Sequence, residues 1–203
     1  MTTPPPKRAN GSIDDGATER DPAAAGELPT NDMARLPART LLLAEKLSIV
    51  DAPAGTLAVL LERAVPRPAS RFLRGRWLGH PLHPIMVTVP IGAWMAVPVL
   101  DLTGQSTAAR RLLAFGIAAA VPASMTGLVE YTTLDVPQRR VALVHVAANS
   151  VGISCFAQSW WRRRSSGGAG LAWTVVGLMT AGLGGALGGH LSYAQGAGVL
   201  RER

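Results

Sequence analysis

The chain has 203 residues, a formal net charge of +7 at pH 7 and one cysteine, and 48% of its residues are hydrophobic. The single cysteine, Cys155, excludes a disulfide framework, a zinc finger and an iron–sulfur motif within this chain. The basic residues lie in short clusters between apolar stretches and not along one polar face, so we expect no nucleic-acid binding. A membrane protein flanked by arginine anchors fits this arrangement better.

The first part of the chain has low hydrophobicity. Residues 1–30 are rich in Pro, Gly, Ala and charged residues and contain almost no large apolar side chains. Such a segment cannot bury enough apolar surface to offset its loss of conformational entropy, so we predict a disordered tail over residues 1–35. We expect no cleaved signal peptide, because no apolar core follows the basic residues near Met1.

Residues 36–76 form a predicted amphipathic and basic juxtamembrane segment. Short apolar-periodic stretches cover about Arg39 to Leu47 and Gly55 to Val65, which predicts helical structure in both. Five arginines then follow without an acidic residue, namely Arg63, Arg67, Arg71, Arg74 and Arg76. The segment would lie on an anionic membrane surface or against a partner. The alternative is a solvated linker that contains a weak helix.

Residues 77–203 contain four apolar runs, each close to the ~20 residues needed to cross a hydrocarbon layer of ~30 Å. These runs are Pro84 to Leu100, Leu112 to Val129, Val141 to Trp160 and Leu171 to Gly189. They are too long for the strands of a barrel, so they should be helices. Because the connecting loops are short, sequential neighbours should be antiparallel. The predicted fold is an all-α integral membrane protein, an up-down four-helix transmembrane bundle.

Aromatic residues and prolines add detail to these spans. The aromatic residues Trp77, Trp94, Tyr131, Trp160, Trp161 and Trp173 mostly fall near the ends of the spans, as interfacial residues do. Pro90, Pro98 and Pro122 should mark kinks.

Small residues repeat along the fourth span. Gly177, Ala181, Gly185 and Gly189 recur at four-residue intervals, and Gly184 and Gly188 form a parallel row. Small residues at this spacing allow close approach of a neighbouring helix, which is the simpler interpretation, or of a flat cofactor.

Four histidines and one glutamate fall at the same end of the four spans. They are His80, His83, Glu130, His145 and His190, and each span contributes at least one of them. Ionisable side chains at membrane depth are costly and are usually retained for a task, so this cluster is the candidate site.

Each member of the cluster also has a structural interpretation. His80 and His83 could be interfacial polar anchors, with Pro84 at the first helical position and His83 near the N-cap. Glu130 could cap a helix or pair with an arginine, and His190 could hydrogen-bond the last carbonyls of its helix. His145 is harder to explain in this way, because it lies inside an apolar run where an imidazole without a partner is costly.

The arginines also indicate an orientation in the membrane. Nine arginines lie at the histidine end of the spans and five at the other end. An excess of arginine marks the cytoplasmic side. We therefore predict a multi-pass protein of the bacterial cytoplasmic (inner) membrane, with the histidine end and both termini in the cytoplasm.

Four motifs carry a resemblance to a known family. They are WLGHPLHPIMVTVPIGAW at 77–94, TGLVEY at 126–131, RRVALVH at 139–145 and GGHLSYAQGAGV at 188–199. With these motifs the chain resembles a bacterial membrane-domain family catalogued as domain of unknown function 2231, over about Leu36 to Val199. Members commonly have Asp in a TGLADW-like motif where this chain has Glu130 and Tyr131, which keeps the carboxylate.

The resemblance has implications for partners more than for activity. Some relatives resemble fusions to a Rieske-type ferredoxin domain, whose Cys and His ligands this chain lacks. The resemblance therefore implies four membrane helices and electron transfer with a separate ferredoxin or Rieske-type protein. The family name itself implies no activity.

Two cofactors suit a His/Glu cluster at one end of a bundle. One b-type haem would take its axial imidazoles from diagonal helices, which favours His83 and His145, with His190 near a propionate. Alternatively, all five residues, His80, His83, Glu130, His145 and His190, would bind iron or zinc without haem.

A third hypothesis involves no cofactor. The same residues would form a polar hydrogen-bonded network in a structural or assembly subunit. The sequence leaves these hypotheses open, as it does homo-oligomerisation. The lipid bilayer is the one partner that all of them share.

Overall fold

The computed structural model describes residues 41–164 and 167–198, all within one compact unit, Leu36–Arg203. The predicted tail over residues 1–35 lies outside the described residues, so its disorder stays a prediction. After a short helical stretch at residues 41–45 the elements are η2 (Ser48–Val50), α2 (Asp51–Ala64), α3 (Arg67–Leu73), α4 (His83–Met86), α5 (Thr88–Leu102), α6 (Ser106–Tyr131), α7 (Val136–Arg162), α8 (Gly167–Gly189) and the π-helical η3 (His190–Ala194).

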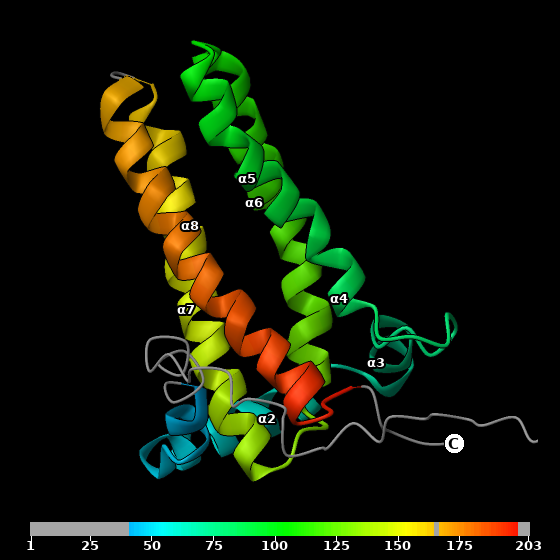
Figure 1. Ribbon diagram of the computed structural model, residues 1–203. Helices are drawn as coiled ribbons and strands as arrows, with labels where there is room; N and C mark the ends of the chain where they lie inside the picture. The colour runs from blue at the N-terminus through cyan, green and yellow to red at the C-terminus, as the bar shows by residue number, and fades with distance from the viewer. Residues whose placement is uncertain (1–40, 165–166, 199–203) are drawn as a thin grey trace, which may run out of the picture. The chain divides into compact units, whose positions relative to one another are not determined.

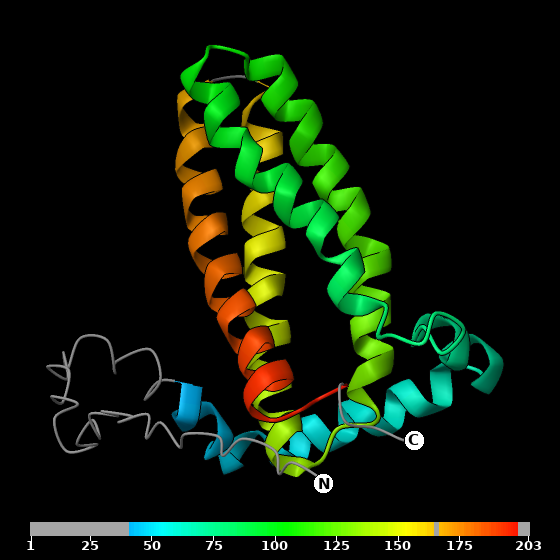
Figure 2. The same cartoon turned by 45° about the vertical axis from the view of Figure 1, so that its right-hand side comes forward.

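Four helical segments are long and apolar enough to cross a membrane. They cover His83–Leu102, Ser106–Tyr131, Val136–Arg162 and Gly170–Ala194, so each predicted span is confirmed and extends by a few residues. The described residues contain no strand. In Figures 1 and 2, α5 and α6 form one helical hairpin, and α7 and α8 form another beside it. The predicted all-α four-helix transmembrane bundle is confirmed.

The four long helices are arranged as a square. Helix α5 packs against α6 and α8, and α6 also packs against α7. Helices α5 and α7 therefore lie diagonally across the bundle. Both begin at the same end and run in the same direction, because one antiparallel helix separates them in the sequence.

The first span is broken near its start. Helix α4 ends at Met86, Val87 lies between the two helices, and α5 begins at Thr88. Pro90 explains the break, because it has no N–H to donate to the Met86 carbonyl and its ring crowds that carbonyl. The kink predicted at Pro90 is therefore present as a break, whereas Pro98 and Pro122 lie inside α5 and α6, which continue past them.

The start of α7 is determined by local sequence. The Asp135 side chain accepts a hydrogen bond from the Gln138 backbone N–H at 2.9 Å, and the Gln138 side chain accepts one from the Asp135 N–H at 3.1 Å. This reciprocal capping box satisfies two donors that a helix start leaves unpaired. It ends the loop after α6 and directs α7 back through the bundle.

Helix α2 packs against the histidine end of the bundle, where Ala54 and Ala58 are buried. Arg140 of α7 binds both carboxylate oxygens of Asp51, at 2.6 and 2.7 Å, and the Tyr131 hydroxyl donates to the Ala54 carbonyl at 3.1 Å. The hydrogen bonds from Arg140 hold the pKa of Asp51 below its ordinary value. The helix predicted over Gly55 to Val65 is thus present, and it is docked on the bundle and not a solvated linker.

Two of the aromatic residues expected near the membrane interface are in the protein interior. Trp94 is 5% exposed and stacks on Phe156, with ring centroids 4.2 Å apart. Tyr131 is 2% exposed because it contacts α2. The interfacial interpretation is wrong for these two residues, since a docked helix and a facing hairpin cover them.

Candidate functional site

His83 and His145 face each other between the two hairpins. His83 is the first residue of α4, and His145 lies inside α7. Their ring centroids are 6.3 Å apart and their ring planes are 81° apart. The predicted juxtaposition of these two residues across diagonal helices is therefore present.

Each of the two rings is held by one nitrogen. His83 Nδ1 lies 2.9 Å from the Ala123 carbonyl oxygen of α6, and His145 Nδ1 lies 2.7 Å from the Gly184 carbonyl oxygen of α8. A carbonyl only accepts hydrogen bonds, so Nδ1 is the protonated nitrogen in both rings. This tautomer leaves Nε2 as the nitrogen with a lone pair.

Polar neighbours surround the two rings. Thr126 Oγ1 lies 3.4 Å from His83 Nδ1, and Asn149 Nδ2 lies 3.3 Å from both nitrogens of His145. An atom equally distant from both nitrogens is not in line with the lone pair of Nε2. The Asn149 amide is instead fixed by donating to the His145 carbonyl oxygen at 2.9 Å.

Glycines make room for the histidine rings. A Cβ on Gly127 of α6 would lie 2.7 Å from His83 Cε1, and a Cβ on Gly188 of α8 would lie 3.0 Å from His145 Cε1. Real side chains do not approach this closely without displacement of a neighbour. Each ring is therefore held between its facing glycine and the other hairpin.

The other three predicted site residues lie apart from this pair. His190 Nε2 is 2.6 Å from Glu45 Oε1, which ties η3 to the segment before η2. His80 is exposed in the turn before α4, and Glu130 is half-buried at the end of α6, near Gly198. Among the described residues, no three His, Cys, Asp or Glu side chains are placed to hold one metal ion.

A second aromatic layer lies deeper in the bundle. Trp94 of α5 stacks on Phe156 of α7, across the same diagonal as the two histidines. A Cβ on Gly116 of α6 would overlap the Trp94 indole, and a Cβ on Gly177 of α8 would lie 2.7 Å from Phe156 Cε1. This layer has the same order as the histidine layer, namely glycine, ring, ring, glycine.

A third pair closes the far end of the bundle. Arg163 donates two hydrogen bonds to the Asp101 carboxylate, at 2.5 and 2.8 Å, and the two side chains are only 2% and 12% exposed. Arg163 also donates to Ser159 Oγ and Thr174 Oγ1, at 3.2 Å each. The guanidinium group is thus surrounded by acceptors, as a buried charge requires.

The three pairs share one sequence offset. Asp101 and Arg163 are 62 residues apart, and so are His83 and His145, and Trp94 and Phe156. In each of these three pairs, a residue of the first hairpin contacts its own counterpart in the second. Contact between counterparts occurs only on a two-fold axis. Since α5 and α7 run in the same direction, this pseudo-two-fold axis runs along the bundle.

The buried faces repeat in the same register. Pro90, Ala93, Trp94 and Val97 of α5 correspond to the buried Gly152, Cys155, Phe156 and Ser159 of α7. Helices α6 and α8 repeat in the same way, with an offset one residue shorter. The buried residues of α6 are Ala109, Leu113, Gly116, Ala123 and Thr126, and their counterparts in α8, also buried, are in the same order Gly170, Thr174, Gly177, Gly184 and Leu187. The carbonyl acceptors Ala123 and Gly184 are themselves counterparts, so the histidine site lies on the pseudo-two-fold axis.

The glycine row of α8 differs from the predicted one. The residues that contact a neighbouring side chain are Gly177, Gly184 and Gly188, whose added Cβ atoms would meet Phe156, Asn149 and His145. Around Gly185 and Gly189 no such atom lies within 4 Å. The prediction that Gly185 faces a helix is wrong, because adjacent helical residues point about 100° apart at 3.6 residues per turn.

Sequence reasoning missed several residues of this arrangement. The partners Glu45, Asp51 and Asn149 carry no motif, and a backbone acceptor such as Ala123 leaves no sequence signal. The repeat could have been found in the sequence. The first and third spans each contain a histidine followed, after the same number of residues, by a large aromatic residue, and the second and fourth spans each contain two glycines separated by that number.

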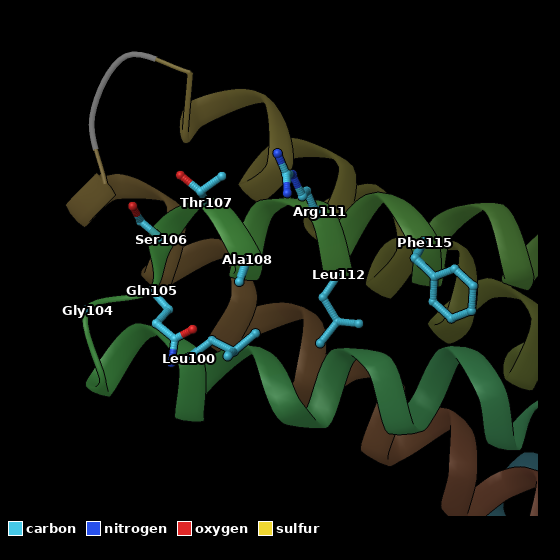
Figure 3. Close-up of a pocket in the computed structure, with 9 residues that line it drawn as sticks. All are labelled: Leu100, Gly104, Gln105, Ser106, Thr107, Ala108, Arg111, Leu112 and Phe115. Atoms are coloured by element: carbon cyan, nitrogen blue, oxygen red, sulfur yellow. The ribbon is translucent and has the colours of Figure 1, made fainter.

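A cavity of about 660 Å³ lies at the end of the bundle remote from the histidines, between the end of α5 and the start of α6. Figure 3 shows Leu100 and Leu112 pointing toward each other in it, whereas Arg111 points away. Arg111 is the one charged residue in its lining, and no His, Cys, Asp or Glu is present there. The lining therefore offers no group for acid–base or metal chemistry.

Comparisons with known proteins identify the family. Neither the curated proteins nor the solved structures include a match. The model of one family matches residues 79–201, which is more than half of the chain and includes all four spans. The chain belongs to DUF2231, a family of predicted membrane proteins.

Proposed function

We propose that this membrane protein is a redox or electron-transfer component that binds one b-type haem through His83 and His145. One observation carries the proposal. Two imidazoles at counterpart positions face each other on the pseudo-two-fold axis, with ring centroids 6.3 Å apart.

The distance and the tautomer both favour shared ligation. A metal bound to one nitrogen of each ring, at the usual distance of about 2.0–2.1 Å, would place the ring centres about 6 Å apart. Metal-binding histidines commonly donate their other N–H to a carbonyl, which orients the ring and leaves the remaining nitrogen basic. The bonds from Nδ1 to Ala123 and Gly184 are of this kind.

The number of ligands favours haem over a non-haem metal. Iron or zinc without a porphyrin needs three or more protein ligands in one place, and the described residues offer no such group. A haem would need only two imidazoles from the protein, which His83 and His145 would supply. The bound group would supply one-electron transfer. This chain's residues would hold it, fix the ring orientation and exclude water between the hairpins.

A structural function is the second candidate, and the same hydrogen bonds favour it. His83 joins α4 to α6 and His145 joins α7 to α8, so each imidazole stabilises its own hairpin without any cofactor. The protein would then be an assembly subunit in which the polar groups keep the helices in register.

Purified protein distinguishes the two candidates. Wild type, His83→Ala, His145→Ala and the matched control His190→Ala are expressed with ample iron and haem precursor, and their spectra, metal content and melting curves are compared. We expect a Soret band in wild type and in the control, and its loss in the His83 and His145 variants. Wild-type protein free of haem, with a lower melting temperature in these two variants, would support the structural candidate and overturn the redox function.

We further propose that the histidine end and both termini face the cytoplasm of a bacterium, where a separate ferredoxin or Rieske-type protein could exchange electrons with the site. The arginine distribution supports this orientation. Reporter enzymes that are active only in the periplasm should be active when fused after Gln105 and silent when fused after Val136. The reverse pattern would place the site outside and remove the cytoplasmic partner from the proposal.

A further inference from the structure

A groove with a basic lining lies between α2, α3 and the end of α6, away from the histidine pair. Its volume is about 470 Å³, and Arg67, Arg71 and Arg74 contribute to its lining, together with the hydroxyls of Ser70 and Thr132. Figures 1 and 2 place α3 outside the four spans, beside α4. The groove is therefore at the level where the chain enters its first span.

The charge of the groove is positive. Arg67 and Arg71 are four residues apart on α3, so they lie on one face of the helix. Among the described residues neither forms an ion pair, and Glu62 is the one acidic residue of the lining. Three guanidinium groups against one carboxylate favour an anionic ligand.

Arg74 is held in place while it keeps a free donor. Its Nη2 atom donates to Thr132 Oγ1 at 2.8 Å, which anchors α3 to the end of α6. Its Nε atom is inaccessible to solvent and has no hydrogen-bond partner in the described part of the chain. This donor is closed off from the groove, so Arg74 contributes its positive charge and its fixed position, and the exposed Arg67 and Arg71 contribute the accessible donors.

An exposed aromatic pair belongs to α3 and the turn that follows it. Phe72 and Trp77 are 60% and 62% exposed, their rings stack at 5.7 Å, and Trp77 Nε1 donates to the Phe72 carbonyl at 3.2 Å. Aromatic residues at the end of a membrane span lie at the headgroup level. The segment that supplies arginines to the groove thus also carries an exposed apolar surface at headgroup level.

We propose that this groove binds the phosphate group of an anionic phospholipid. The phosphate oxygens accept hydrogen bonds from Arg67, Arg71 and the hydroxyls, since guanidinium–phosphate bonds are charge-assisted. The acyl chains lie beside Phe72 and Trp77. A lipid held there would fix α3 at the membrane surface, next to the turn that carries His80.

The test uses the full chain in detergent, freed of lipid, with its melting temperature as the readout. Phosphatidylglycerol should raise the melting temperature of wild type, and phosphatidylcholine should not. In Arg67→Gln/Arg71→Gln the phosphatidylglycerol concentration for the half-maximal shift should rise about 30-fold, because each arginine near an anionic surface contributes about fivefold in affinity. The matched control Lys46→Gln/Arg63→Gln removes two charges outside the groove and should respond as wild type does.

Inorganic phosphate separates a lipid from a free anion. Phe72→Ser/Trp77→Ser should weaken the response to phosphatidylglycerol and leave any response to phosphate unchanged. Equal responses to the two lipids, or equal loss in the groove and control variants, would overturn the proposal. Phosphate alone could also shift the melting temperature as much as the lipid does, and by the same amount in Phe72→Ser/Trp77→Ser as in wild type. That result would assign the groove to a soluble anion and would overturn the proposal as well.

Discussion

Replacement of Gly177 by Ala should destabilise the bundle, whereas the same replacement at Gly185, two turns further along α8, should not. A Cβ on Gly177 would lie 2.7 Å from Phe156 Cε1. Phe156 is fully buried and stacks on Trp94, which in turn lies against Gly116. The ring therefore has no free direction in which to move.

The two effects of the replacement can be compared. Overpacking of a filled core costs about 1–3 kcal/mol. Alanine recovers up to about 1 kcal/mol over glycine inside a helix. At Gly185 only the recovery applies, because nothing apart from the adjacent residues and backbone of its own helix lies within 4 Å of the added carbon. Gly177→Ala should thus be less stable than Gly185→Ala by about 1–3 kcal/mol.

Reversible unfolding in mixed detergent micelles, followed by tryptophan fluorescence, measures this difference. Phe156→Leu removes the ring edge that the new carbon would meet, so Gly177→Ala should cost less in that background. Equal stability of the two alanine variants would refute the packing argument. An unchanged cost in the leucine background would show that Phe156 is not the obstacle.

Three further predictions follow from named contacts. Arg163→Asp should lower the free energy of unfolding by about 3–5 kcal/mol, because it leaves Asp101 unpaired and buried. The exchange Asp101→Arg/Arg163→Asp should recover part of this loss, because counterparts meet on the axis. If unfolding measurements show no recovery, the pseudo-symmetry argument fails. Arg140 lowers the folded pKa of Asp51. The stabilisation from Asp51 is therefore fully present above the unfolded pKa of about 3.9, and it is lost as the pH falls through the lower folded pKa. Melting curves of wild type and Asp51→Asn should differ at pH 7 and converge in acid. Tyr131→Phe should lower stability by about 0.5–1.5 kcal/mol through loss of its bond to the α2 backbone, and limited proteolysis should then cleave α2 faster.

Much of the fold could be predicted because its causes are local. The spans follow from apolar runs of sufficient length, since a backbone in lipid must satisfy its own hydrogen bonds. The start of α7 follows from Asp135 and Gln138, which are three residues apart. The position of His145 inside an apolar run pointed to a partnered imidazole, and its partner is the Gly184 carbonyl.

The composition of the candidate site depended on the tertiary structure. All five predicted residues share one end of the bundle by sequence. The structure brings His83 and His145 together, whereas His190 binds Glu45. The position of a residue along its helix determines how deep it lies in the membrane. The rotation of each helix about its own axis determines which neighbour the residue faces. Gly184 and Gly185 share a depth but face different surroundings for this reason. That rotation results from packing both hairpins at once around a common axis, so no single span contains the information.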